Sequence, residues 1–160
     1  MEAPELIMTT ASNILALVSN LAERRPFQPE EVSRVLGLPL QPEPAMSNDY
    51  FTIYSGLADG PQAPFQEVEL RVPTDKASRK DGLLLCRVEP TVRVTRDEVQ
   101  RRFGASPGLA FPSPREPPDS PVYLVYSRPW GSLRFGFSND DAPSLVSVIL
   151  DADKQASTSR

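Results

Sequence analysis

The sequence predicts an α+β protein made of two tandem units, each a helix followed by three strands, with a further helix before the first unit. Two observations lead to this prediction. The segment QPEEVSRVLG at residues 28–37 reappears as TRDEVQRRFG at residues 95–104, with the same kind of residue in five of ten columns. Three strand-like segments then follow each copy in the same order. We therefore expect an antiparallel sheet with the helices on one face and the other face uncovered.

The segment ahead of the first copy has the spacing of an amphipathic helix. Its opposite face carries Thr, Ser and Asn rather than Lys and Arg, so we expect it to pack on a core and not on a membrane surface. We assign residues 1–24 to this helix. The apolar side chains that recur at helical intervals are Ile7, Ile14, Leu17, Val18 and Leu21.

Each repeated segment carries helix start and stop signals. Thr95 and Glu98 are three residues apart, which is the spacing of a capping box, and Pro29 stands at the first helical position of the other copy. Gly37 and Gly104 each follow the last apolar helical residue, where a left-handed termination requires glycine. Both segments are therefore expected to form short helices that end at these glycines.

The apolar stripe is wider in the first of these short helices than in the second. Val32, Val35 and Leu36 form one stripe that suits packing on a sheet. The second helix keeps Val99 but has Arg102 at the position of Val35. We therefore expect the second helix to bury a narrower face.

Six further segments combine β-branched or aromatic residues with apolar alternation, which suits half-buried strands. We assign the first unit to residues 25–90, the second to residues 91–153, and a disordered tail to residues 154–160. The strand segments are FTIYSG (51–56), VELRV (68–72) and LLLCRV (83–88) in the first unit, and YLVYSR (123–128), LRFGF (133–137) and LVSVIL (145–150) in the second.

The composition excludes several kinds of chemistry. The chain has no histidine and one cysteine, Cys86, so Ser-His-Asp and Cys-His catalysis and the usual zinc sites lack their residues. No glycine-rich phosphate loop occurs. The paired acids at residues 30–31 and 140–141 suit a helix start and a turn. We expect no enzymatic activity, no cofactor and no metal site, and we expect Cys86 to be a buried apolar residue.

The charge balance indicates the kind of partner. The formal net charge is −4, and no cluster of Lys and Arg accompanies it, so we do not expect nucleic-acid binding. An acidic chain favours encounter with a basic protein. No segment contains the 18 or so apolar residues that span a bilayer, so we expect no membrane span.

We expect a protein partner to contact aromatic and acidic side chains on the strands and turns. Aromatic residues concentrate at the energetic centres of interfaces, and carboxylates suit a basic partner. In the alternative interpretation the tyrosines pack in the core, the tryptophan folds over its own hairpin, and the aspartates are solvated turn residues. The candidate residues are Tyr54, Asp59, Tyr126, Trp130, Asp140 and Asp141.

The segment VTRDEVQRRFGASP, residues 94–107, resembles the helix-to-glycine segment of small bacterial envelope lipoproteins, including the small lipoprotein of the outer-membrane β-barrel assembly machine. A tandem copy of such a unit is similar to the secreted β-lactamase inhibitory proteins, whose two helix-and-sheet repeats grip an enzyme with a concave sheet. The resemblance covers residues 25–153 through short motifs. One cysteine cannot form the two disulfides of those inhibitors, and no lipid-attachment cysteine lies near the start.

These features favour an inhibitor that works by binding. The best interpretation is a bacterial immunity protein that neutralises a toxin or hydrolase, for example one delivered by a type VI secretion system, by occluding its active site. This interpretation predicts a periplasmic protein whose leader or lipid anchor is missing from the present sequence. The alternatives are an envelope scaffold for outer-membrane assembly and a cytoplasmic adaptor or effector chaperone. Exposed sheet edges would also support a homodimer through strand addition.

Overall fold

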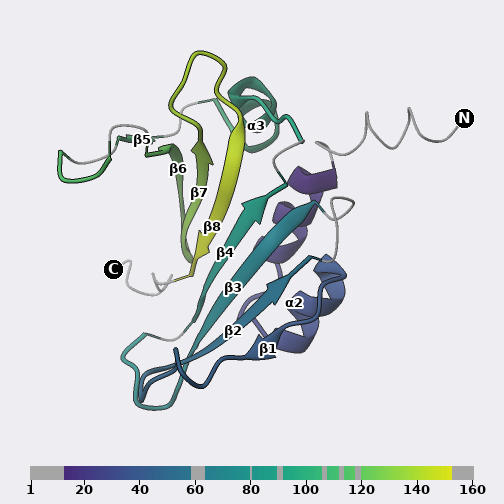
Figure 1. Cartoon of the computed structure of the whole chain (residues 1–160), viewed down its shortest axis with the longest axis vertical. Helices are drawn as coiled ribbons and strands as arrows, with labels where there is room; N and C mark the ends of the chain where they lie inside the picture. The colour runs from purple at the N-terminus through teal and green to yellow at the C-terminus, as the bar shows by residue number, and fades with distance from the viewer. Residues whose placement is uncertain are drawn as a thin grey trace, which may run out of the picture.

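The computed structural model of the protein describes residues 13–58, 64–79, 81–89, 92–105, 108–111, 114–117 and 120–152. Within these residues the chain forms three helices and one eight-stranded antiparallel sheet, a mixed α+β fold (Figure 1). The predicted tail at residues 154–160 lies outside the described residues, as do Ile7 and Asp59.

The helices form where the apolar spacing predicts them. The first helix is described over residues 13–22, and its Ile14, Val18 and Leu21 are fully buried. The second and third helices are α2 (Pro29–Leu36) and α3 (Arg96–Phe103). None of the helices in the described part of the chain is both long and apolar enough to cross a bilayer.

The helix ends follow the predicted signals with one difference. The capping box at Thr95 and Glu98 is present, and Gly37 ends α2 in the left-handed region, with φ 65° and ψ 33°. Gly104 instead has φ 130° and ψ 156°, so the chain leaves α3 in an extended direction that still favours glycine. The hydroxyl of Tyr126 donates a hydrogen bond to the Gly104 carbonyl oxygen over 2.7 Å. This bond satisfies a backbone carbonyl beside the helix end.

The sheet contains the six predicted strands and two short additional ones. Each predicted segment lies within an observed strand, extended by no more than a few residues at its ends. The additional strands, of two and three residues, lie in or beside proline-rich stretches and carry little sequence signal. The strands are β1 (Gln41–Pro42), β2 (Phe51–Leu57), β3 (Phe65–Pro73), β4 (Leu83–Val88), β5 (Gly108–Ala110), β6 (Val122–Arg128), β7 (Gly131–Phe137) and β8 (Leu145–Asp151).

The strand order is β1-β2-β3-β4-β8-β7-β6-β5, and all neighbours are antiparallel. The strands β4 and β8 therefore meet at the centre, and Cys86 lies opposite Val148 there. The two short strands form the outer edges of the sheet. Short edge strands offer few unpaired backbone groups for strand addition.

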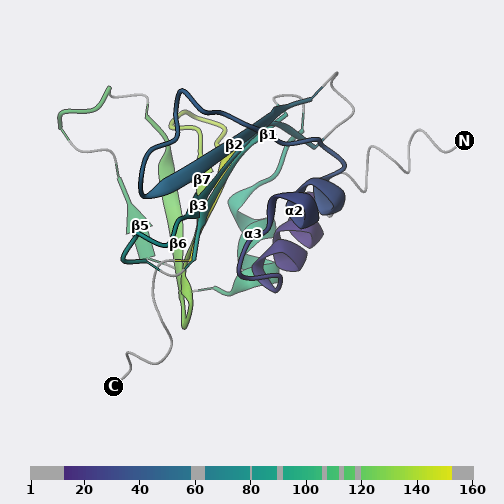
Figure 2. The same ribbon diagram turned by 90° about the horizontal axis from the view of Figure 1, so that it is seen from below.

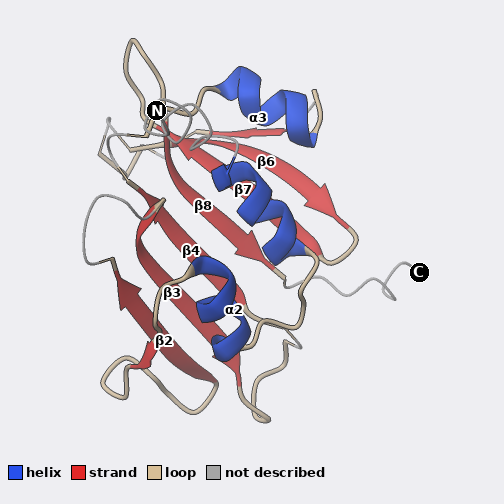
Figure 3. Cartoon of the chain, turned by 90° about the vertical axis from the view of Figure 1, so that its right-hand side faces the viewer, coloured by secondary structure: helices blue, strands red, loops and turns tan. Residues whose placement is uncertain are grey.

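The three helices lie on the same side of the sheet, as Figures 2 and 3 show. One hydrophobic core contains residues from these helices and from one face of the sheet. Alternation along β4 separates the two faces, because Leu84, Cys86 and Val88 are buried whereas Arg87 is exposed. The helix α3 joins this core through the Phe103 ring, whose centroid is 4.9 Å from that of Phe135.

Candidate functional site

The face of the sheet that points away from the helices, called here the open face, is the candidate site. Residues paired across antiparallel strands point to the same face, so the registers identify its rows. One row runs Leu57, Glu67, Arg87, Ser147, Gly136, Tyr123, and the next runs Ser55, Glu69, Leu85, Ile149, Arg134, Val125.

A hollow of about 380 Å³ lies at the middle of the open face, over β4 and β8, and is called here the central hollow. Leu85 and Ile149 are paired residues that form its apolar floor. Tyr123 and Pro121 stand on the side of β6, and Glu67 and Glu69 on the side of β3. Arg87, Val146 and Ser147 also line it.

Two irregularities of strand pairing lie beside the central hollow. In β3 the register shifts between Phe65 and Glu67. In the β7–β8 pair it shifts where Gly136 and Phe137 face Ser147 and Leu145, so Val146 is the extra residue of β8. Bulges bend the strand that carries them and increase its local twist. This explains why the consecutive residues Val146 and Ser147 both line the hollow.

Tyr123 and Ser147 line one side of the hollow, and Gly136, which lies between them in the row, leaves room for both side chains. A Cβ atom on Gly136 would lie 2.6 Å from the Ser147 Oγ and 2.7 Å from the Tyr123 Cε1. The tyrosine ring and the serine hydroxyl therefore both lie close to the glycine. The Ser147 Oγ is buried and has no hydrogen-bond partner among the described residues.

Charged side chains border the apolar floor. Arg87 Nε lies 3.4 Å from Glu67 Oε1, and both side chains are more than half exposed. Arg71 Nε lies 2.6 Å from Glu69 Oε2, which is the less exposed of the two carboxylates. An exposed ion pair such as Glu67–Arg87 contributes about 0–1 kcal/mol, so Glu67 is held only weakly by its present partner.

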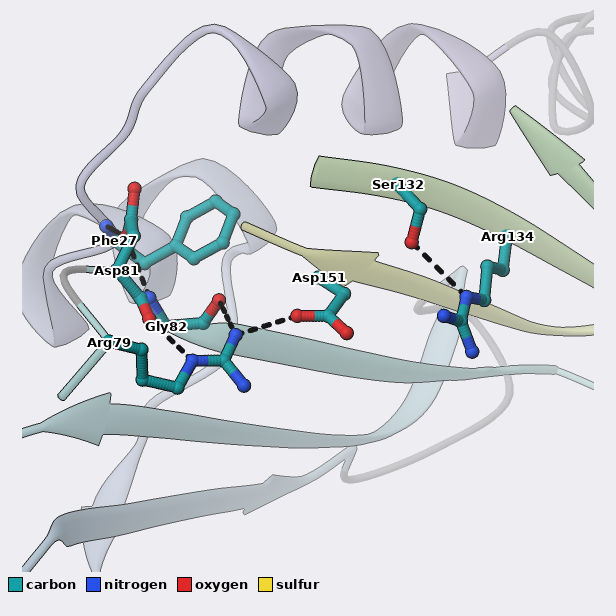
Figure 4. A network of polar contacts seen from close by, with 7 residues as sticks. All are labelled: Phe27, Arg79, Asp81, Gly82, Ser132, Arg134 and Asp151. Carbon is teal, nitrogen blue, oxygen red and sulfur yellow. Dashed lines mark hydrogen bonds and ion pairs between the residues drawn. The ribbon is translucent and has the colours of Figure 1, made fainter. Parts of the chain in front are cut away.

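A network of polar contacts ties the β3–β4 connection to β8 at one end of the open face (Figure 4). The Arg79 guanidinium donates to Asp151 Oδ1 over 2.6 Å and to the Asp81 carbonyl oxygen over 3.1 Å. Asp81 Oδ1 accepts from the backbone N–H groups of Gly82 and Phe27, over 2.7 and 3.3 Å. The contacts join three segments distant in sequence, so we interpret the network as structural.

Tyr54 and Tyr126 lie on the core face and not on the open face. Tyr54 is partly buried against the core, and Tyr126 is 5% exposed. Burial raises the pKa of the Tyr126 phenol, and the neighbouring Arg128 guanidinium lowers it in part. This placement agrees with the alternative interpretation, in which the two tyrosines pack in the core. A role of these tyrosines in partner binding stays a prediction.

Trp130 lies in the two-residue turn between β6 and β7 and packs against the core while half-buried. The Arg25 guanidinium carbon is 4.9 Å from its ring centroid, a distance typical of a cation–π contact. The ring therefore meets the segment that follows the first helix, and not its own hairpin alone. Whether it also meets a partner stays a prediction.

Asp140 and Asp141 are exposed in the β7–β8 loop. The Asp140 carboxylate accepts hydrogen bonds from the Ser138 hydroxyl over 3.3 Å and from the Ala142 N–H over 3.1 Å, as turn residues do. Asp59, the third predicted acidic contact, lies outside the described residues. Binding by these aspartates stays a prediction.

Cys86 faces the core at the centre of the sheet and is 1% exposed. Burial raises the pKa of its thiol from 9.0 to about 12, so the thiol stays protonated and unreactive at neutral pH. In the part of the chain that the structure describes, no three acidic or thiol side chains gather closely enough to hold a metal ion.

Sequence reasoning did not single out Tyr123, Ser147 and Ile149, which line the central hollow. Their signal was the alternation of each strand, since every second residue of a half-buried strand faces away from the core. Alternation alone does not show which strands become neighbours.

No family model, no curated protein and no solved structure matches this chain.

Proposed function

We propose that this protein is a non-enzymatic inhibitor that binds another protein on its open face and covers the active site of that partner. The observation that carries the proposal is the central hollow, an apolar floor with a charged border on a sheet face that no described helix covers. Apolar centres with polar borders are the usual anatomy of specific protein interfaces.

We further propose that the sheet is built from two tandem helix-and-three-strand units. The strand order supports this, because β4 and β8, the third long strand after each short helix, pair at the centre, and the earlier strands follow outward in the same order on both sides. The helices α2 and α3 each have eight residues and each precede three long strands. A duplicated unit of this kind doubles the width of the open face.

The particular form that we propose is a periplasmic immunity protein for a bacterial toxin or hydrolase. The net charge of −4 supports a basic partner, and the lack of histidine supports a role without catalysis. The resemblance to the two-repeat inhibitory proteins supports the same mode of action. Fold alone does not define function, so the test concerns the surface and the partner together.

The test places a photo-crosslinking amino acid at Leu85, in the floor of the central hollow, or at Arg34, an exposed position on α2. We expect the Leu85 position to crosslink the partner in cells and the Arg34 position to give no product. Purified protein should then inhibit the activity of that partner. Leu85→Glu should weaken inhibition by about tenfold or more, as for a buried interface residue, and Arg34→Glu should not.

The product of the neighbouring gene is the first partner to assay. A crosslink confined to Arg34 would contradict the open face as the binding surface. Capture of outer-membrane assembly components from Leu85 would replace the inhibitor by the envelope scaffold. Capture of an unsecreted cargo would replace it by the adaptor or effector chaperone.

A further inference from the structure

We propose that the central hollow receives one arginine side chain of the partner, with its aliphatic stem on the floor and its guanidinium toward Glu67 and Ser147. This inference rests on the proposed function and names the chemistry of the anchor. A volume of about 380 Å³ is at the lower end of the roughly 300–1,000 Å³ typical of ligand pockets, so the hollow suits one side chain.

The floor suits the aliphatic stem. Leu85 and Ile149 are directly paired residues of the two central strands, and both are half-buried. Tyr123 adds an aromatic wall on the side of β6. The planar guanidinium of arginine stacks on aromatic faces and is more weakly hydrated than an ammonium group. These properties favour arginine over lysine in a site that has an apolar floor and an aromatic wall.

The carboxylates of the lining suit a cation. Glu67 and Glu69 both line the hollow; Glu69 is paired with Arg71 over 2.6 Å, whereas Glu67 has only the longer contact of 3.4 Å with Arg87. Glu67 and Glu69 lie two residues apart on β3 and therefore point to the same face. Because the Glu67–Arg87 pair is long and exposed, Glu67 can exchange its partner at little cost.

A buried hydroxyl without a partner supplies the second polar position. Ser147 and Glu67 lie in one row on either side of Arg87, two strand spacings or roughly 10 Å apart at the backbone. The Ser147 Oγ has no hydrogen-bond partner among the described residues. A guanidinium offers five N–H donors in a fixed plane, so it can donate to Glu67 and to Ser147 together once the Tyr123 ring moves aside.

The test titrates the isotopically labelled full chain with three small probes while backbone amide signals are followed by nuclear magnetic resonance. The probes are propylguanidinium, the neutral butyramide and the anionic butyrate. We expect propylguanidinium to shift the amide signals of Leu85, Ser147 and Ile149, and to bind more tightly than either other probe. The double variant Glu67→Gln/Glu69→Gln should weaken its binding about fivefold, as expected for loss of roughly 1 kcal/mol of partly screened charge attraction.

The matched control removes the same charge from the helix side of the molecule, with Glu30→Gln/Asp97→Asn at two exposed positions. This variant should bind propylguanidinium like the wild type. Equal binding of butyramide, tighter binding of butyrate, or an equal loss in the control variant would overturn the arginine anchor. These outcomes would leave the proposed function standing if the Leu85 crosslink forms. Conversely, loss of that crosslink would contradict the function whatever the probes show.

Discussion

The two halves of the sheet, β2–β4 and β6–β8, are alike on the core face and different on the open face. Counting outward from the central Cys86–Val148 pair gives corresponding positions in both halves. At core positions both halves are apolar, as at Val68 and Phe135. On the open face Ser55 corresponds to Tyr123, Glu67 to Arg134, Glu69 to Gly136 and Leu85 to Ser147.

This difference gives the central hollow two unlike sides. The first half supplies carboxylates on β3, whereas the second half supplies the aromatic ring of Tyr123, which lies close to Gly136 of β7. A core requires apolar side chains of matching volume, whereas an exposed sheet face tolerates any residue compatible with a strand. Two halves with similar cores can thus form one asymmetric surface.

The largest expected effect compares the core of the two halves. Phe135 is fully buried and contacts the rings of Phe103 and Tyr126, whereas its counterpart Val68 is fully buried without an aromatic cluster. We expect Phe135→Ala to lower the free energy of unfolding by about 4 kcal/mol and Val68→Ala by about 2 kcal/mol. The loss is larger for Phe135→Ala because removing a phenyl ring leaves a larger cavity than removing two methyl groups. Urea unfolding of both variants measures the difference. Equal losses of unfolding free energy in the two variants would show that the core of each half depends equally on the side chain at this position.

An intermediate effect compares two strand glycines, Gly56 in β2 and Gly136 in β7. A Cβ atom on Gly56 would lie 2.5 Å from the backbone carbonyl oxygen of Pro39, which cannot move without shifting the chain. On Gly136 the nearest atoms belong to the Ser147 hydroxyl and the Tyr123 ring, which can rotate. We expect Gly56→Ala to cost about 3 kcal/mol and Gly136→Ala about 1 kcal/mol.

Thermal unfolding of the two alanine variants checks this order, and an aromatic resonance of Tyr123 should move in Gly136→Ala alone. A larger loss from Gly136→Ala than from Gly56→Ala would contradict it. That result would mean that the tyrosine ring over Gly136 is held as firmly as the backbone beside Gly56.

The smallest expected effect concerns the central pair, Cys86 and Val148. Cys86→Val places in the first half the residue type found at Val148 in the second half. It should change the free energy of unfolding at pH 7 by less than about 1 kcal/mol, because the cysteine and valine side chains have similar volumes. The pKa of the thiol is about 12 in the folded protein and 9.0 when unperturbed, so the unfolded chain releases its proton first. The stability contributed by the protonated thiol is therefore complete below pH 9 and falls between pH 9 and 12, by up to about 1.4 kcal/mol per pH unit.

Unfolding curves at pH 7 and pH 10 for wild type and Cys86→Val measure this effect. The wild type should lose more stability than the variant between these two pH values. A thiol reagent should also label the wild type only after denaturant is added. Labelling of the native protein at pH 8 would show that the central pair opens in the folded state.

Much of the fold could be predicted from the sequence because its signals are short-range. The capping box at Thr95, the proline start of α2 and the alternation of β4 each depend on residues within one turn or one strand. The strands β1 and β5 were not predicted, because two or three residues beside prolines give no periodicity to detect. Their pairing depends on contacts with neighbouring strands.

The register of the strands shows where sequence reasoning stops. Matching the two units by sequence aligns Tyr54 with Tyr126, whereas counting through the strand pairs aligns Ser55 with Tyr123, a shift of four residues. Both alignments put the same residues on the same face, because the shift is even. Turn length and packing decide between such registers, and the two hairpins have different turns. As a result Tyr54 and Tyr126 share one core row with Leu70, Leu84, Leu150 and Leu133.

The sequence by itself determined the helix starts, the position of the six main strands, the face that strand residues take away from the bulges, and the lack of histidine chemistry. These properties follow from local backbone preferences and from apolar alternation. Only the tertiary structure decided that β4 pairs with β8 and that Glu67 and Tyr123 border one hollow, although 56 positions separate them in the chain. The physical reason is that strand order and register depend on long-range pairing and on bulges, which no single segment encodes.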